Sequence, residues 1–334
     1  MQLRELGGSG INASVIGFGA WAIGGWNWGG ADENEAIKAI HAAIDNGINL
    51  IDTAPIYGFG HSEEVVGKAL KGGWRQKAVL ATKCGLVWEG TNGDHFFDSS
   101  DGIVEEDDNP KAKYHVYRYL NPKSIRREVE NSLRRLGVDV IDVMQTHWQE
   151  TVTPIAETAA ELLKLKKEGK IRAIGCSNAT PEQMDEYRQV APLDVDQEKY
   201  SMLDRDMEKT NLPYCAEHKV AFFAYSPLAQ GLLTGKVGLD REFSETDQRA
   251  NDPRFSLESR KKILSFLDGL KPIMDKHRAT PGQLVSAWTV AQPGCSHALL
   301  GARNPKQVEE NAVAGSIMLD KEDLDFIANA MEKL

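Results

Sequence analysis

The sequence predicts an α/β protein, a (β/α)8 TIM barrel, from two observations. Apolar runs of strand length alternate with segments whose apolar residues follow helical spacing, and the alternation continues through eight units. The strand-length runs are apolar enough to be covered on both faces, which is typical of parallel strands in α/β proteins. Eight such units favour a closed barrel over an open sheet. We therefore expect residues 1–334 to form one barrel domain.

The expected elements follow one another along the chain. A β-hairpin around Gly7 and Gly8 opens the chain and is expected to plug the bottom of the barrel. The eight predicted strands cover 14–19, 47–52, 78–83, 139–146, 171–176, 193–197, 220–225 and 297–300. The eight predicted helices cover 33–46, 62–71, 122–136, 154–168, 181–189, 206–217, 281–291 and 305–314. Five of them begin near a proline, which is tolerated in the first turn of a helix, and an extra helix over 320–333 ends the chain.

Two βα connections are much longer than the others, residues 84–121 and 226–258. The βα loops of a barrel project from its C-terminal face, where active sites are built, so both are candidate lids over a substrate or cofactor. The first contains the acidic run 101–108, which we interpret as a solvated part of the loop.

The composition restricts the possible partners and compartment. The chain has 39 Lys+Arg against 49 Asp+Glu, a net charge of −10, which argues against nucleic acid as a partner. No run of 18 apolar residues and no secretory leader is present in the sequence, so we expect a cytoplasmic protein that does not bind membranes. The four cysteines are far apart and predict free thiols rather than disulfides or a zinc pair. The oligomeric state is left open.

Polar residues stand at or just after the ends of three consecutive predicted strands. These are Asp52 with Tyr57 after the second strand, Lys83 after the third and His147 after the fourth. Each alone is more often structural, but the C-terminal strand ends of a barrel meet at one mouth, so the four are expected to converge.

These four residues have a definite use in combination. A phenol is a weak acid near neutral pH, and an adjacent ammonium should lower its pKa, so Lys83 would make Tyr57 a usable general acid. Asp52 would keep Lys83 charged, and His147 could donate a hydrogen bond to a developing oxyanion. Such a site suits carbonyl reduction, with a nicotinamide or flavin as the hydride source.

The remaining strand ends suggest where a cofactor lies. Ser177, Asn178 and Gln197 offer hydroxyl and amide groups for a carboxamide, and Tyr225 offers a flat ring face. The segments 226–235 and 301–311 follow the last two strands and contain glycine-rich turns and a helix start, which suit a pyrophosphate.

Several separate motifs resemble those of the aldo-keto reductase family. They are G-F-G-A-W at 17–21, N-L-I-D-T-A-P-I-Y-G at 49–58, L-A-T-K at 80–83, Q-T-H-W at 145–148, I-G-C-S-N at 174–178, Y-S-P-L-A-Q-G-L-L-T-G at 225–235 and G-A-R-N-P-K-Q-V-E-E-N at 301–311. The resemblance covers essentially the whole chain. It is strongest to the bacterial branch with a long loop after strand three, which includes reductases of small aldehydes, such as 2-oxoaldehydes, and of sugar-derived carbonyls.

The resemblance implies an NAD(P)H-dependent oxidoreductase without a metal. It implies Asp52, Tyr57, Lys83 and His147 as the catalytic tetrad. The cofactor-binding residues that it implies are Gly19, Ala20, Trp21, Ser177, Asn178, Gln197, Tyr225, Ser226, Pro227, Leu228, Gln230, Gly231, Gly301, Arg303, Gln307, Glu310 and Asn311. Trp21, Trp88 and Trp148 are expected to line the substrate pocket, with Trp26 and Trp28 as further candidates.

One departure from the family bears on the choice of cofactor. Many members that prefer NADPH carry Lys-Ser where this chain has Gly301-Ala302, and Arg where it has Gln307. Arg303, with Lys306, remains to meet a 2′-phosphate. We therefore expect NADPH to be favoured, with NADH as the alternative.

Two other functions and one other binding motif are alternatives to the reductase. A Schiff-base lyase could use Lys83 as its nucleophile, but the neighbouring Asp52 would raise the lysine pKa rather than lower it. A regulatory module that senses the cofactor would keep the fold without turnover. The G-F-G-A-W-A run at 17–22 fits a loose dinucleotide fingerprint, but no helix start follows it.

Overall fold

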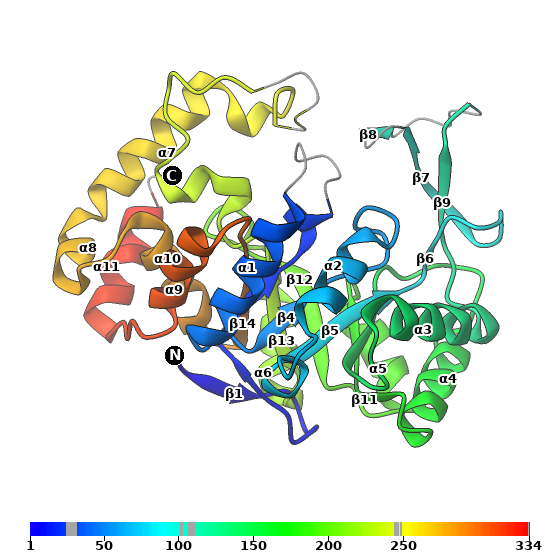
Figure 1. The fold of residues 1–334 in the computed structure, drawn as a ribbon. Helices are drawn as coiled ribbons and strands as arrows, with labels where there is room; N and C mark the ends of the chain where they lie inside the picture. The colour runs from blue at the N-terminus through cyan, green and yellow to red at the C-terminus, as the bar shows by residue number, and fades with distance from the viewer. Residues whose placement is uncertain (25–31, 101–102, 106–110, 244–246, 248, 333) are drawn as a thin grey trace.

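The computed structural model describes residues 1–24, 32–100, 103–105, 111–243, 247, 249–332 and 334. Eight parallel strands close into a barrel in the order β10-β11-β12-β13-β14-β3-β4-β5 (Figure 1). These strands are β3 (Ile16–Gly19), β4 (Leu50–Asp52), β5 (Val79–Cys84), β10 (Ile141–Thr146), β11 (Ile171–Ser177), β12 (Val195–Lys199), β13 (Ala221–Tyr225) and β14 (Cys295–Gly301). The predicted TIM barrel is confirmed, with every strand within about three residues of its expected position.

Helices surround the barrel and connect its strands. They are α1 (Glu33–Asp45), α2 (His61–Ala69), α3 (Pro122–Leu136), α4 (Ile155–Lys167), α5 (Pro181–Arg188), α6 (Asn211–His218), α9 (Pro281–Ala291) and α10 (Pro305–Ala314), followed by the C-terminal α11 (Lys321–Met331). Side-chain caps explain several starts. Thr180 and Thr280 each form a capping box with the glutamine three residues later, which satisfies backbone N–H groups that the helix leaves unpaired.

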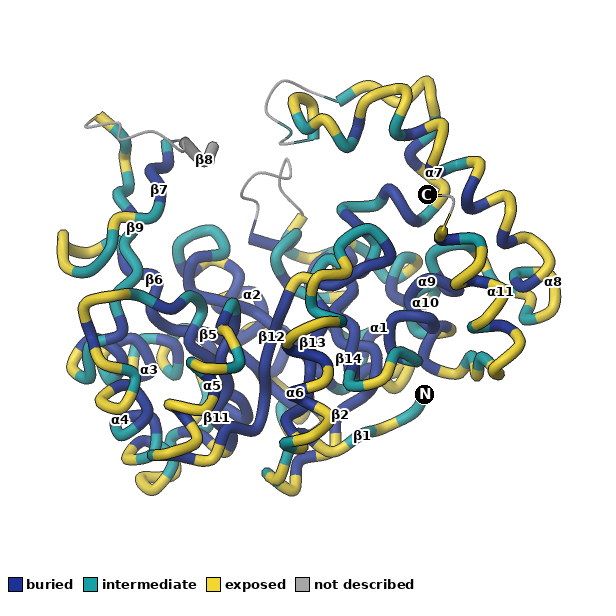
Figure 2. Tube along the Cα trace, turned by 180° about the vertical axis from the view of Figure 1, so that it is seen from behind, coloured by how far each residue is buried: buried dark blue, intermediate teal, exposed yellow. Residues whose placement is uncertain are grey.

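The barrel interior is filled by apolar side chains and closed from below by the N-terminal hairpin, β1 (Leu3–Glu5) and β2 (Asn12–Ser14). Leu6, Ile11 and Ala13 pack into the same buried cluster as strand residues such as Phe223 and Leu299. The predicted plug is therefore confirmed. Figure 2 shows the buried strands and inner helix faces enclosed by the more exposed outer surface.

The expected helix over 206–217 is wrong in one respect. The structure has a short 3-10 turn, η3 (Asp206–Lys209), and then α6, with a break at Thr210. Pro213 explains the break, because its ring would collide with the carbonyl of Lys209 in a continuous helix.

The two long connections contain regular structure that the sequence did not predict. The connection of residues 84–121 contains a four-stranded sheet of order β6-β9-β7-β8, which we call the rim sheet. Its strands are β6 (Leu86–Val87), β7 (Asp94–Ser100), β8 (Ile103–Glu105) and β9 (Tyr114–Arg118). The connection after β13 contains η4 (Ala229–Thr234) and η5 (Pro253–Phe255) and leads into α7 (Leu257–Gly269) and α8 (Lys271–His277). Both lie at the end of the barrel opposite the hairpin (Figure 1).

Further expectations concern the cysteines and individual segments. All four cysteines are buried free thiols, as predicted. Within the described part of the chain, no helix has the length and apolarity needed to span a bilayer. Trp26 and Trp28 lie outside the described residues, as does most of the acidic run 101–108. Two short 3-10 turns complete the fold, η1 (Trp21–Ile23) and η2 (Arg75–Lys77).

Candidate active site

The four residues predicted from the strand ends meet at the barrel mouth. Lys83 Nζ donates to Asp52 Oδ2 over 2.7 Å and to the Tyr57 hydroxyl over 3.3 Å, and its side chain is 1% exposed. The Tyr57 ring lies edge-on to His147, with 6.0 Å between ring centroids. Strand register produces this arrangement, because Asp52 is paired with Ala81 of β5, two residues before Lys83.

Burial determines the charge of each group. Burial lowers the pKa of Lys83, but Asp52 and then Tyr57 outweigh it, so the pKa is raised and the ammonium persists. Burial also raises the pKa of Tyr57, and Lys83 only opposes that rise. The prediction that Lys83 lowers the Tyr57 pKa below its ordinary value is therefore wrong here, because desolvation of the phenolate is the larger effect. The phenol keeps its proton.

His147 is neutral in this environment. Burial holds the pKa of its imidazole well below the ordinary value, and the charge on Lys83 lowers it further. Its backbone fixes its place, since its N–H donates to the Cys84 carbonyl over 2.8 Å and its carbonyl accepts from Asn178 Nδ2 over 2.9 Å. A neutral imidazole offers one N–H donor to a substrate oxygen.

The residues expected to hold a carboxamide form one connected group. Tyr225 donates its hydroxyl hydrogen to Asn178 Oδ1 over 2.9 Å, and Asn178 Nδ2 also donates to Ser177 Oγ over 3.0 Å. Asn178 adopts φ +54, a conformation that Asn tolerates better than most residues. Gln197 also reaches the tetrad, because its amide nitrogen donates to Asp52 Oδ1 over 3.0 Å.

The turn expected to meet a pyrophosphate has an unusual backbone. Ser226, Ala229, Gln230 and Gly231 all adopt positive φ between 46 and 99. Leu228, just before Ala229, has φ −93 and ψ 12. A right-handed residue followed by a left-handed one orients successive N–H groups into the concavity that anions bind. Strained non-glycine residues of this kind cluster at ligand sites.

The last predicted cofactor segment surrounds the start of α10. Asn304 caps the helix by accepting from the Gln307 N–H, and Gln307 Oε1 accepts from the Arg303 N–H over 2.8 Å. Asn311 Nδ2 donates to the Gly301 carbonyl over 3.3 Å. Gln307 thus orients the turn that carries the exposed Arg303 side chain.

The mouth is walled by aromatic side chains. Trp21 stacks near Tyr57 with ring centroids 6.1 Å apart, at the turn that follows Gly19 and Ala20. Trp148 contacts Phe96 of the rim sheet at 5.2 Å between centroids, and Trp88 meets Phe59 edge-on at 5.4 Å. The structure therefore brings the three predicted tryptophans to one mouth.

Comparisons with known proteins agree across the whole chain. The model of the aldo/keto reductase family matches residues 15–332. A relative in Escherichia coli, the NADH-specific methylglyoxal reductase, is 43% identical over 100% of this chain and 99% of its own length. The chain belongs to the aldo/keto reductase family.

Two further relatives share nearly the full length of this reductase. Aldo-keto reductase YhdN of Bacillus subtilis is 41% identical over 99% of this chain and 94% of its own. The solved structure of the glycerol dehydrogenase AKR11B4 from Gluconobacter oxydans is 41% identical, superposes with a TM-score of 0.86, and covers 99% of this chain and 95% of its own. The protein is thus an oxidoreductase that reduces carbonyl groups with NAD(P)H. The lyase and cofactor-sensor alternatives gain no support.

Sequence reasoning missed several residues of this reductase site. Gln145 donates to Asp52 over 3.3 Å and accepts from Gln197. Alternation along β10 could have found it, because residues two apart in a strand share a face and Gln145 is two before His147. Phe59 and Phe96 carried no such signal, since one lies in a turn and the other in a strand that the sequence did not predict.

Proposed function

We propose that this reductase converts a small aldehyde, a 2-oxoaldehyde or a sugar-derived carbonyl, into the alcohol, with Tyr57 as the proton donor. The observation that supports the role of Tyr57 is the position of Lys83 Nζ, in hydrogen-bond reach of both the buried Asp52 carboxylate and the Tyr57 hydroxyl. A charged donor beside a protonated phenol stabilises the phenolate only after the proton has left.

Each residue of the tetrad has one part in this proposal. Tyr57 gives its proton to the substrate oxygen as negative charge develops there, and Lys83 stabilises the resulting phenolate. Asp52 keeps Lys83 charged and fixed, and Gln145 and Gln197 hold Asp52 through its other oxygen. His147, neutral and partly buried, donates a hydrogen bond to the same substrate oxygen.

The donor set beyond the tetrad fits a nicotinamide dinucleotide. We assign Ser177, Asn178 and Gln197 to the carboxamide and Tyr225 to the ring face, since the first three offer amide and hydroxyl groups. The bound nicotinamide would supply the hydride. The positive-φ turn of 226–231 suits the pyrophosphate, and Glu310 and Asn311 on α10 suit the adenine end. Gly19, Ala20, Trp21 and Gly301 border the same mouth from β3 and β14.

The pocket walls support a small substrate. Trp21, Trp88 and Trp148 offer flat apolar ring surfaces at the mouth, which suit short carbon chains and C–H contacts. The relative named for methylglyoxal acts on a 2-oxoaldehyde, which is consistent with this size class. We therefore propose methylglyoxal and small sugar aldehydes as the first substrates to assay.

We further propose that NADPH is preferred over NADH, with Arg303 binding the 2′-phosphate. Arg303 is exposed on the turn before α10, and Gln307 orients that turn. Because an E. coli relative is NADH-specific, the measurement must compare both cofactors. Titration with each, followed by quenching of tryptophan fluorescence, gives the two affinities directly.

Two variants test the assignment of Arg303. Arg303→Ala should weaken NADPH binding roughly 10- to 100-fold, the loss expected for a hydrogen bond to a charged group, and should leave NADH nearly unchanged. Lys306→Ala measures whether this neighbouring cation also contributes to NADPH binding. Equal losses of affinity for both cofactors in Arg303→Ala would exclude the 2′-phosphate role. If neither NADPH nor NADH supports turnover of any aldehyde in the panel, the proposed function is overturned.

A further inference from the structure

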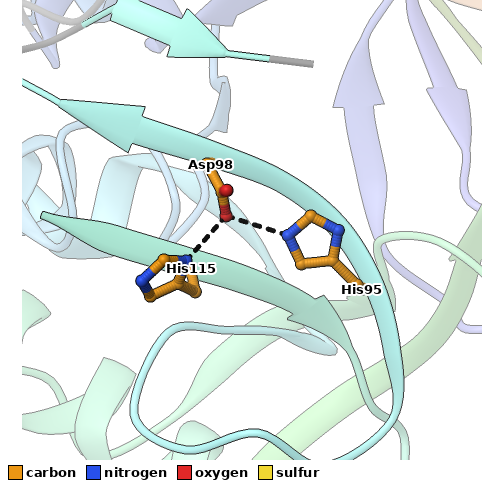
Figure 3. A group of neighbouring side chains, drawn as sticks. All are labelled: His95, Asp98 and His115. Atoms are coloured by element: carbon orange, nitrogen blue, oxygen red, sulfur yellow. Dashed lines mark hydrogen bonds and ion pairs between the residues drawn. The ribbon is translucent and has the colours of Figure 1, made fainter. Parts of the chain in front are cut away.

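The rim sheet carries a cluster of two histidines and an aspartate that is separate from the tetrad. His95 Nε2 lies 2.8 Å and His115 Nδ1 lies 2.9 Å from the same oxygen of Asp98, Oδ1 (Figure 3). The ligand atoms of all three lie within 4.8 Å of one another. From this convergence we propose that His95, Asp98 and His115 form a binding site for a divalent transition metal, best suited to Zn2+.

The backbone places the three side chains on one face of the sheet. Asp98 and His115 are directly opposite each other on the antiparallel strands β7 and β9. In a regular strand, His95 would point away from Asp98, because residues three apart lie on opposite faces. The register shifts between His95 and Phe97, and this bulge adds one residue to β7 and returns His95 to the face of Asp98.

The donor chemistry matches the proposed metal. Two imidazole nitrogens and one carboxylate oxygen are ligands that Zn2+ accepts in tetrahedral sites, with a water molecule in the fourth position. Bond lengths of about 2.0–2.2 Å place tetrahedral ligand atoms about 3.4 Å apart, so the distance from each histidine nitrogen to Asp98 Oδ1 would need to lengthen by about half an ångström. The two nitrogens would release the hydrogens they share with Asp98 to their other ring nitrogen or to solvent.

Burial of the cluster also fits a metal site open to solvent. The Asp98 side chain is fully buried, whereas His95 and His115 are 34% and 36% exposed. The carboxylate therefore forms the floor and the imidazoles form the outer edge, which an ion can reach from solvent. His95 is further oriented by an edge-on contact with Tyr117 at 5.3 Å between centroids.

The opposite face of the same strands faces the substrate pocket. Phe97 and Val116 alternate with the metal-binding side chains and pack in one cluster with Tyr57 and Trp148. A metal joining β7 to β9 would thus hold the wall of the pocket without touching the substrate. We assign it a structural role.

The test is a zinc titration of the untagged, metal-free full chain against a chromophoric chelator. We expect one equivalent to bind, and His95→Gln and His115→Gln each to weaken binding at least about tenfold, since loss of an outer-shell partner alone costs roughly 10- to 100-fold. His61→Gln, at an exposed histidine of α2, is the matched control and should bind like the unaltered protein. Absence of stoichiometric binding, or equal binding by the variant lacking both His95 and His115, would overturn the site.

A second measurement uses the unaltered protein and so does not depend on variant folding. Diethyl pyrocarbonate modifies accessible imidazoles, and mass spectrometry reads each site separately. Zinc should protect His95 and His115 and leave His61 reactive. Unchanged modification of both cluster histidines at saturating zinc would contradict the proposal.

Discussion

The barrel mouth and the rim sheet both place a buried carboxylate against basic side chains, but they differ in what surrounds them. At the mouth, Lys83 and Asp52 are both nearly inaccessible, and their pairing raises the pKa of Lys83 and keeps its ammonium charged. In the rim sheet, Asp98 is buried but His95 and His115 are partly exposed. The enclosed group is suited to holding a proton until reaction, whereas the open group is suited to exchanging protons for an ion.

The largest expected effect is at the mouth, in Tyr57→Phe. This change removes only the proton donor and should lower kcat about 100- to 10,000-fold, the usual contribution of general acid catalysis. Cofactor affinity should be nearly unchanged, because the ring beside Trp21 remains. The control is Tyr114→Phe, at a rim-sheet tyrosine whose ring stacks on Phe59, and this variant should keep the kcat of the unaltered protein. Substantial turnover by Tyr57→Phe would remove Tyr57 from the mechanism.

The second-largest effect is on the free energy of unfolding, and it depends on the burial of the Lys83–Asp52 ion pair. Lys83→Met leaves Asp52 buried with only amide donors from Gln145 and Gln197. Removing one partner of a buried ion pair costs about 3–5 kcal/mol, so the free energy of unfolding in urea should fall by that amount.

A surface pair provides the control for that measurement. Lys68 and Glu33 form an ion pair of 2.8 Å in which both side chains are well exposed. Lys68→Met should change the free energy of unfolding by less than about 1 kcal/mol, because solvent screens such pairs. Similar losses of unfolding free energy in Lys83→Met and Lys68→Met would mean that burial does not make the ion pair at the mouth more important for stability than a surface pair.

The third effect lies where the chain leaves the barrel for the rim sheet. Glu128 of α3 accepts from the Gly85 N–H over 2.7 Å and from Ser124 Oγ over 3.0 Å, and burial raises its pKa from 4.5 to about 7. A raised folded pKa stabilises the protein fully below pH 4.5, and this stabilisation is lost as the pH rises to about 7. The decline should be about 3 kcal/mol at most, at about 1.4 kcal/mol per pKa unit.

Glu128→Gln isolates this contribution. The variant cannot ionise at this position, so the difference in unfolding free energy between it and the unaltered protein should shrink from pH 4.5 to pH 7. Urea unfolding at several pH values measures it, with Glu64→Gln, at an exposed residue of α2, as the surface control. A constant difference for Glu128→Gln would show that Glu128 ionises normally in the folded protein.

The two regions also differ in how far the sequence could predict them. The mouth follows from local rules, because Asp52, Lys83 and His147 each stand at or next to a strand end and a parallel barrel brings those ends together. The rim sheet does not, since the bulge at Phe96 breaks the alternation that marks a strand. His95 and His115 become neighbours only through a strand register that no short-range pattern specifies.

Other misses have similar physical causes. The region of α7 and α8 is divided at Leu270, with Pro272 in the first turn of α8, so neither helix produces a long periodic pattern. The Tyr57 pKa was misjudged because the sequence identifies the neighbouring charge but not the depth of burial, and burial is the larger effect. The sequence therefore predicts which charged residue lies beside Tyr57, whereas the extent to which Tyr57 is desolvated can be known only from the folded structure.

The smallest expected effect tests whether the rim sheet influences the mouth at all. Phe96 contacts Trp148, and the Arg118 guanidinium lies over the Phe96 ring, 5.3 Å from its centroid. Phe96→Leu removes an aromatic pair that contributes about 0.5–1.5 kcal/mol, so KM for a carbonyl substrate should rise roughly 2- to 10-fold. Because the ring contacts of Phe96 are with Phe97 and Trp148 rather than with a tetrad ring, kcat and NADPH affinity should stay unchanged.

Steady-state kinetics distinguish an effect on KM from an effect on kcat, and the control is a variant that loses an aromatic ring outside the rim sheet. Phe243 meets Phe255 edge-on at 5.3 Å in the connection after β13, so Phe243→Leu loses a similar aromatic pair away from the rim sheet. A rise in KM in Phe96→Leu alone would place the rim sheet in the substrate wall. A fall in kcat instead would mean that the sheet positions the catalytic groups, and the separation between an enclosed catalytic mouth and an open structural rim would no longer hold.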